Sequence, residues 1–241
     1  MKMQKITPAL QLEHHFLIHG QVINEKESIQ PFNEEAKAVC SHNSELYYEL
    51  ENGFPCIRGS IQLIESKKIV TDSYEVKIMW SPGYPFKFPL VFETGGRIPI
   101  NLEWHVFEID GHCCIKAIPE EMVLCKKGIS LDWFISTQLV PYFFNQSFRQ
   151  ENGYYYHERS HGIKGILESF ADIFKTTNVN SILNLLSVLN ESSDYKATAK
   201  CKCGSNRKYK KCHRRIIRSL STMRWYNIPD IIRQIKIYQS L

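Results

Sequence analysis

Apolar and polar residues alternate along two stretches in the first third of the chain. Residues at every second position are apolar or small from Ile57 to Leu63 and again from Tyr74 to Trp80. Because successive side chains of a strand point to opposite faces, this period predicts two half-buried antiparallel strands. A shorter apolar stretch, Leu90 to Glu93, predicts a further strand.

Helical spacing of apolar residues dominates elsewhere. Ser130 or Asp132 is expected to cap a helix that runs through Phe144. The remaining helices are expected within residues 8–19, 32–50, 166–174 and 182–189. Strands grouped before helices predict an α+β fold class.

Between the strands and the later helices, the chain loses any regular period. Three prolines within residues 82–89 exclude a helix and a central strand. Residues 98–115 follow no period, and an irregular segment of that length inside a compact domain is usually a functional loop.

Composition narrows the class of protein. The chain has 241 residues, of which 43% are hydrophobic, enough for one substantial core and an appendage. It contains no run of about 18 apolar residues, so no membrane-spanning helix is expected. The first residues, Met1 to Lys5, lack the pattern of a secretory signal. We therefore expect a cytoplasmic protein without a membrane partner.

Charge is divided unevenly along the chain. Residues 195–241 contain 13 lysines and arginines and the single acid Asp230, whereas residues 1–194 contain 17 bases and 24 acids. Such asymmetry suggests two units with different partners, and the basic tail suits an acidic protein surface or a phosphate backbone.

Four metal-binding residue types lie close together in the basic tail: Cys201, Cys203, Cys212 and His213. Three thiolates and an imidazole at this spacing predict a closed tetrahedral Zn²⁺ site, structural because no position is left for water. Gly204 allows the tight turn between the two arms. Residues 199–214 resemble the SEC-C motif. That resemblance implies a small basic knuckle that docks on a protein partner or ribosome, as in the tail of the preprotein translocase ATPase.

The central loop carries a second resemblance. Residues 84–92 resemble the Tyr-Pro-x-x-x-Pro-x-Val-x-Phe signature of ubiquitin-conjugating enzymes, and His105 with residues 110–115 resembles their active-site loop. The likeness, to divergent bacterial members, implies that Cys114 is the nucleophile, that Cys113 replaces an apolar neighbour and that His105 organises the loop. Adjacent cysteines on an extended segment point to opposite sides, so one should face outward. Two buried structural thiols are the alternative.

Where the family has His-Pro-Asn, this chain has His105, Val106 and Phe107, so the expected asparagine is missing. His112 or Asn101 is a candidate replacement donor. Asp132 and Glu120 are candidates for orienting an incoming amine.

The resemblance implies an α+β fold with an antiparallel meander sheet flanked by helices, here with a helical extension and the small zinc knuckle. It also implies a thioester-carrying transferase. Its partners would be a ubiquitin-like protein or peptide donor, an activating enzyme and a protein target, such as a cyclic-nucleotide synthase in bacterial antiphage defence. The expected domains are residues 8–175 (conjugating-enzyme-like), 176–198 (helix and linker) and 199–241 (basic zinc-binding tail). The alternatives are a catalytically silent docking module and nucleic-acid binding by the tail.

A run of aromatic and histidine residues, Tyr154 to Gly162, has two interpretations. We expect aromatics that cover the core and histidines on the surface, rather than a second site. No His-x-x-x-His or His-x-x-Glu-His pattern supports a zinc hydrolase.

Overall fold

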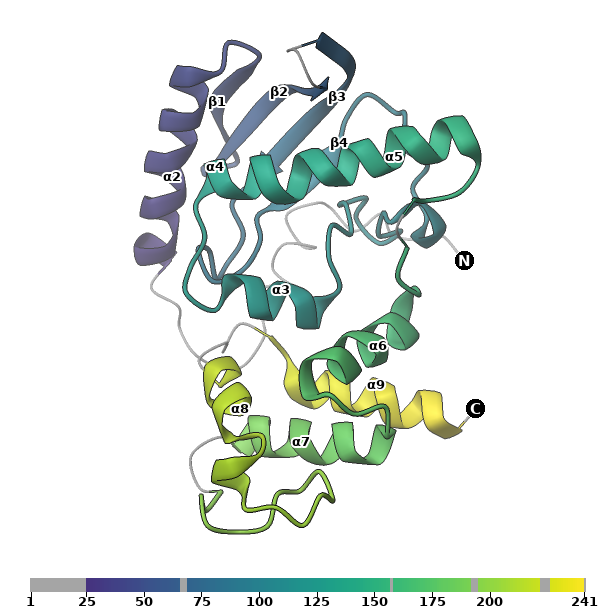
Figure 1. The fold of residues 1–241 in the computed structure, drawn as a ribbon. Helices are drawn as coiled ribbons and strands as arrows, with labels where there is room; N and C mark the ends of the chain where they lie inside the picture. Colours follow the sequence, from purple (N-terminus) through teal and green to yellow (C-terminus); the bar gives the residue numbers. More distant parts are fainter. Residues whose placement is uncertain (1–24, 66–68, 157, 192–194, 222–225, 241) are drawn as a thin grey trace, which may run out of the picture.

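The computed structural model describes residues 25–65, 69–156, 158–191, 195–221 and 226–240. A sheet with covering helices forms one part of the molecule, and a group of helices with the cysteine-rich knuckle forms the other (Figure 1). The α+β class is confirmed. The helix expected within residues 8–19 lies outside the described residues.

The described strands form one antiparallel sheet in the order β1-β2-β3-β4. Their bounds are β1 (Leu46–Glu51), β2 (Phe54–Glu65), β3 (Ile69–Met79) and β4 (Leu90–Glu93). Ile57 lies opposite Ile78, and Ile61 lies opposite Tyr74. All three strands predicted from the apolar pattern are therefore confirmed.

The helix predicted over residues 32–50 is wrong in its second half. Helix α2 (Glu25–His42) ends early, and β1 begins at Leu46. The Asn43 side chain accepts a hydrogen bond from the amide of Glu45 in the turn between them. The tyrosines and leucines of this segment fit either structure locally, and pairing with β2 decides for a strand.

The helices predicted after the sheet, from Ser130 and within residues 166–174 and 182–189, are present, whereas those at 118–125, 214–220 and 228–240 were not predicted. Ser130 accepts a hydrogen bond from the Trp133 amide and is the predicted N-cap. The helix that it begins contains a π-helical stretch before Pro141. The elements are α3 (Ile118–Cys125), α4 (Leu131–Phe134), η2 (Ile135–Leu139), α5 (Val140–Asn152), α6 (Gly162–Phe174), α7 (Val179–Glu191), α8 (Arg214–Leu220) and α9 (Ile228–Ser240), with 3-10 turns η1 (Leu102–Trp104) and η3 (Tyr209–Lys211).

Aromatic side chains hold the helices and the proline-rich loop onto the sheet. Tyr74 of β3 stacks on Phe143 of α5, with ring centroids 4.5 Å apart. Glu35 of α2 accepts hydrogen bonds from the Tyr84 hydroxyl and from the Leu131 amide. One half-buried carboxylate thereby joins α2, the proline loop and the start of α4.

The helices of the tail pack against the preceding helical segment. Helix α7 packs against α8 and α9, and the buried residues of those two helices include Ile217, Leu220, Ile231 and Ile235. The segment predicted as helix and linker thus contacts the basic tail directly through α7. The predicted domain boundaries remain a prediction.

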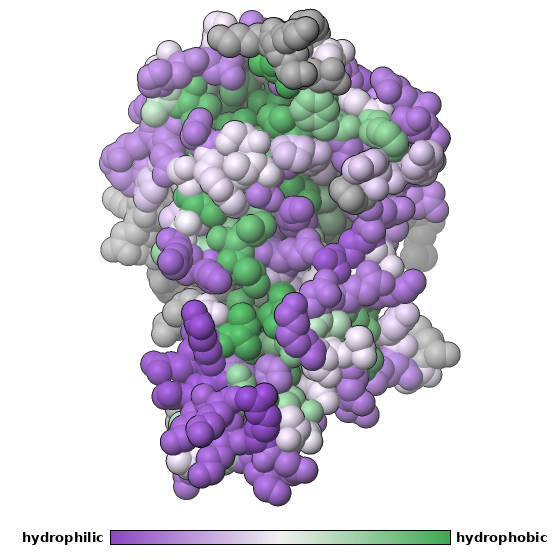
Figure 2. Space-filling view, in the orientation of Figure 1, coloured by the Kyte–Doolittle hydropathy of each residue, from purple (hydrophilic) through white to green (hydrophobic). Residues whose placement is uncertain are grey.

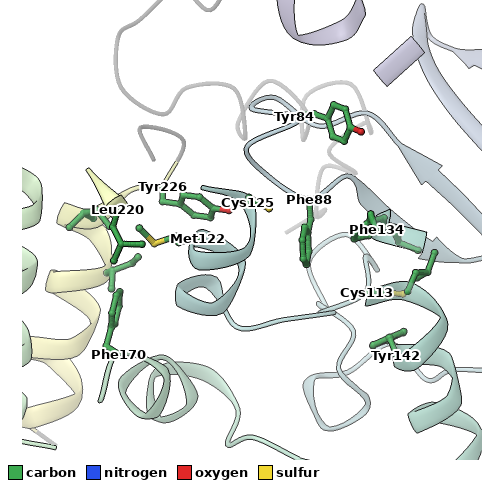
Figure 3. Close-up of a cluster of buried hydrophobic side chains, with 14 of the residues drawn as sticks. Tyr84, Phe88, Cys113, Met122, Cys125, Phe134, Tyr142, Phe170, Leu220 and Tyr226 are labelled. Carbon is green, nitrogen blue, oxygen red and sulfur yellow. The ribbon is translucent and has the colours of Figure 1, made fainter. Parts of the chain in front are cut away.

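Helix α3 joins the two parts of the molecule. Its buried residues Met122 and Cys125 lie in one apolar cluster with Phe170, Leu220 and Tyr226, which come from the helical part (Figure 3). Helix α3 also packs against α6. Among the described residues, no helix is both long enough and apolar enough to cross a membrane.

Candidate metal centre and cysteine loop

The predicted metal ligands converge in the structure. The ligand atoms of Cys201, Cys203, Cys212 and His213 all lie within 4.8 Å of one another. The sulfurs of Cys203 and Cys212 are 3.7 Å apart, and Nδ1 of His213 lies 3.3 Å from Cys201 Sγ and 3.2 Å from Cys212 Sγ. Ligands bound tetrahedrally to Zn²⁺ lie roughly 3.3–3.8 Å apart, and these three separations are close to that range.

Backbone contacts bring the two arms of the knuckle together. Lys200 and Lys208 form an isolated antiparallel bridge, and the Cys201 amide donates to the Arg207 carbonyl at 2.8 Å. Gly204 adopts φ +84°, the left-handed conformation that the predicted turn requires. The 3-10 turn η3 then returns the chain to Cys212.

His213 is oriented by a contact outside the cluster. Its Nε2 donates a hydrogen bond to the Phe174 carbonyl at the end of α6, at 2.8 Å. This places the proton on Nε2 and leaves Nδ1 unprotonated toward the sulfurs, the tautomer that a metal ligand needs. Ser181 of α7 similarly donates to the Cys203 carbonyl. The knuckle is therefore attached to α6 and α7 through its own ligands.

The sulfurs differ in their readiness to ionise. Burial opposes ionisation of Cys203, but hydrogen bonds from Ser205, Cys201 and Cys212 outweigh it and lower its pKa to about 6. Burial raises the pKa of Cys201 to about 12. A thiolate is thus favoured at Cys203 first, and a bound cation would displace the protons from the other thiols.

The two adjacent cysteines of the central loop point to different environments. The Cys113 amide donates to the Val91 carbonyl on one side, and the Cys114 amide donates to the His105 carbonyl on the other, both at 2.7 Å. Cys113 is only 5% exposed and belongs to the apolar core beside Tyr142 (Figure 3). Cys114 is half-buried. The two thiols therefore differ in burial, and the choice of Cys114 as the thiol that faces a cleft stays a prediction.

Acidic side chains surround Cys114. Burial, with added repulsion from Glu121 and Glu120, raises the pKa of the Cys114 thiol to about 11. Burial also raises the pKa of Cys113, to about 12. Neither cysteine lies in the electropositive setting that lowers a thiol pKa, so the thiolate at Cys114 is scarce near neutral pH.

His105 holds the loop through its backbone. It adopts φ 52° after η1, and its carbonyl accepts hydrogen bonds from the Cys114 amide and from the Tyr142 hydroxyl. Its ring packs against Tyr155 and His161, at centroid distances of 4.8 and 4.5 Å. Burial, with repulsion from His161, lowers the His105 pKa to about 4. These contacts suit a positioning residue, which is the role that the sequence predicts.

The candidate replacements for the missing asparagine already have partners. Asn101 caps η1 by accepting from the Trp104 amide. His112 contacts Asp110 through Nδ1 at 2.6 Å and stacks on Phe107, the residue that stands in the asparagine position.

The two candidate acids are placed differently. Glu120 lies near Cys114 but forms an ion pair with Arg159 at 2.6 Å. Asp132 is exposed in the first turn of α4.

The segment that covers the central loop was not predicted from the sequence. Tyr155, Arg159 and His161 pack on or pair with residues of the central loop and of α3. The aromatic and histidine run from Tyr154 to Gly162 was the available signal, but it does not reveal which distant residues these side chains meet.

Comparison with known proteins identifies one part of the chain. Residues 198–215 match the model of the SEC-C motif. Searches of curated proteins and of solved structures found no significant match to the chain. The motif and the convergent cluster of three cysteines and a histidine together support metal binding, with zinc as the ion that fits.

Proposed function

We propose that Cys114 accepts an acyl group as a thioester and passes it to an amine, as the resemblance to ubiquitin-conjugating enzymes implies. The observation that carries this proposal is the contrast between the adjacent thiols, because Cys113 is packed in the core while Cys114 is half-buried on the other side of the loop. The order of elements supports it, since a helix and a four-stranded antiparallel meander precede the cysteine loop and helices follow it, as expected for that family.

The reaction has two balanced steps. In the first, the Cys114 sulfur loses its proton and attacks the activated carboxyl carbon of the donor, and the activating group leaves with its electron pair. In the second, the target amine attacks the thioester carbon, the carbon–sulfur bond breaks, and the amine loses a proton as an amide forms. Sulfur both attacks and leaves well, so the carrier needs no hydrolytic machinery.

The raised pKa of Cys114 shapes both steps. A thiol of high pKa is less often ionised, but its thiolate is more nucleophilic and is a poorer leaving group. The bound thioester would therefore react more slowly with water and with the target amine alike. Deprotonation would have to accompany docking of the donor, because Glu120 and Glu121 oppose a free thiolate.

Donor, partners and pathway follow from the resemblance. The donor would be a ubiquitin-like protein or a peptide tail, supplied by an activating enzyme, and the target a protein such as a cyclic-nucleotide synthase in bacterial antiphage defence. The basic knuckle would dock an acidic protein face. Figure 2 shows hydrophilic side chains gathered over the end of the molecule where Figure 1 places the knuckle.

Intact mass spectrometry tests the transfer reaction. The chain is incubated with a cognate activating enzyme, ATP and donor. We expect an adduct of the donor's mass that dithiothreitol removes, in the wild-type chain and in Cys113→Ala but not in Cys114→Ala. An adduct that persists in Cys114→Ala would contradict the assignment.

A catalytically silent docking module is the second candidate. The acidic surroundings of Cys114 and the aromatic contact made by Phe107 favour it. Alkylation at raised pH separates the two candidates, because an accessible carrier thiol reacts with iodoacetamide in the folded state once it ionises, whereas an inaccessible structural thiol stays inert.

Nucleic-acid binding by the basic tail is a third candidate function. It requires an affinity that falls steeply as salt concentration rises. Titration of a labelled oligonucleotide at several salt concentrations would detect that slope.

A further inference from the structure

Two histidines and a glutamate meet beside the cysteine loop. A ring nitrogen of His105, a ring nitrogen of His161 and a carboxylate oxygen of Glu158 all lie within 4.8 Å of one another. Nε2 of His161 is 3.1 Å from Oε1 of Glu158. Two such ligands bound to one Zn²⁺ lie roughly 3.3 Å apart, so this pair has the required spacing already.

Fixed contacts hold the residues of this cluster in place. His105 is anchored through its backbone in the central loop. On the other side, the amide and hydroxyl of Ser160 both donate to Glu168 of α6, and Arg159 pairs with Glu120 and Asp172. A Cβ added at Gly165 would lie 1.8 Å from the Ser160 carbonyl oxygen, so the segment lies directly against α6.

The donor set and its surroundings indicate the kind of ion. We propose that His105, Glu158 and His161 bind a second Zn²⁺, with three protein ligands and an open position. Two imidazoles and a carboxylate, without thiolates, leave a fourth coordination position free. The four ligands of the knuckle leave none. Glu158 and His161 also line a solvent-open cavity of about 410 Å³, together with Arg159, Ser160 and Lys164. The cationic side chains of Arg159 and Lys164 in this cavity would favour an anionic fourth ligand.

The site is linked to the nearby thiol through one residue. The His105 carbonyl accepts the hydrogen bond of the Cys114 amide. An ion held by the His105 ring would therefore restrain the loop that carries Cys114. The metal site itself does not depend on the proposed transfer reaction.

Calorimetric titration with Zn²⁺ tests the proposal on the full chain, first brought to one zinc per chain in the knuckle. We expect the wild-type chain to bind a second zinc. His161→Ala should weaken this second binding by at least about 100-fold. Mutation of a residue that only hydrogen-bonds to a metal ligand already lowers metal affinity by about 10–100-fold. Glu158→Gln is the second variant and should weaken it in the same direction while keeping the side-chain volume.

His112→Ala is the matched control. This histidine lies on the same loop but bonds Asp110 and stands outside the cluster, so the variant should still bind two zincs. A wild-type chain that saturates at one zinc would overturn the proposal. A second zinc bound with unchanged affinity by both His161→Ala and Glu158→Gln would overturn it too, because the ion would then be held elsewhere.

Discussion

The knuckle and the central loop use cysteine in opposite ways. In the knuckle, the sulfurs of Cys203 and Cys212 lie 3.7 Å apart, and hydrogen-bond donors lower the pKa of Cys203 to about 6. In the central loop, burial with two carboxylates raises the pKa of Cys114 to about 11. The knuckle therefore favours a thiolate at Cys203, whereas Cys114 in the loop stays protonated near neutral pH.

The comparison shows that the groups around a cysteine, rather than the residue type, set the pKa of its thiol. Both segments have irregular backbones held by a few amide hydrogen bonds. What differs is the set of groups around the sulfur. These groups are Ser205 and further thiols in the knuckle, and Glu120 and Glu121 of α3 at the central loop.

The largest effect is expected from breaking the knuckle. Cys203→Ser removes one of four zinc ligands, and structural zinc supplies about 10–16 kcal/mol in isolated zinc-finger peptides. We expect loss of the knuckle zinc and unfolding of the attached segments around α7 and α8, measured by zinc content and limited proteolysis. Cys40→Ser, a half-buried cysteine on α2, is the control and should keep both zinc and fold. Equal zinc content in the two variants would refute the closed site.

A smaller loss of stability is expected when the segment around Ser160, which covers the central loop, is displaced. Gly165→Ala places a methyl group against the Ser160 carbonyl, and overpacking of this kind costs about 1–3 kcal/mol. Thermal unfolding should show that loss, and zinc titration should show weaker binding at His161. Lys164→Ala, at an exposed position of the same helix, should leave the stability nearly unchanged. Equal melting temperatures for the two variants would contradict the close packing.

The adjacent thiols should differ in their contributions to stability. Cys113→Ser places a hydroxyl in the apolar core, which costs about 1–3 kcal/mol if the group finds no partner. Cys114→Ser, at a half-buried position, should cost less than about 1 kcal/mol. Urea unfolding of the two variants measures the difference. Equal losses would show that both thiols are structural.

The last prediction concerns how the rate of alkylation of Cys114 depends on pH. With a pKa of about 11, Cys114 has about 100-fold less thiolate at pH 8 than a thiol of pKa 9, so alkylation should be slow and rise steadily up to pH 11. Glu120→Gln should speed the reaction by less than about tenfold, since repulsion from Glu120 is the smallest of the three causes. Peptide mass analysis would follow Cys114 alone. A rate that levels off near pH 8 would contradict the raised pKa.

The same shift predicts the sign of a stability change. The folded-state pKa of Cys114 lies above that of an unfolded thiol, so its protonated form favours the fold at neutral pH. This contribution is lost as pH rises from about 8.5 toward 11.

The sequence by itself determined the features that depend on near neighbours. Alternation predicted β2 and β3, Ser130 was identified as a cap, and the spacing from Cys201 to His213 predicted the metal cluster. Each of these rests on contacts among residues close in the chain or on one uninterrupted period.

Only the tertiary structure decided which distant groups meet. Pairing with β2 turned residues 46–51 into a strand, and packing of α3 placed Glu120 and Glu121 beside Cys114. Packing of α6 brought His161 to His105, more than 50 residues away. Such contacts depend on where whole elements come to rest, and burial and charge at a site are sums over those contacts, so no local pattern of residues encodes them.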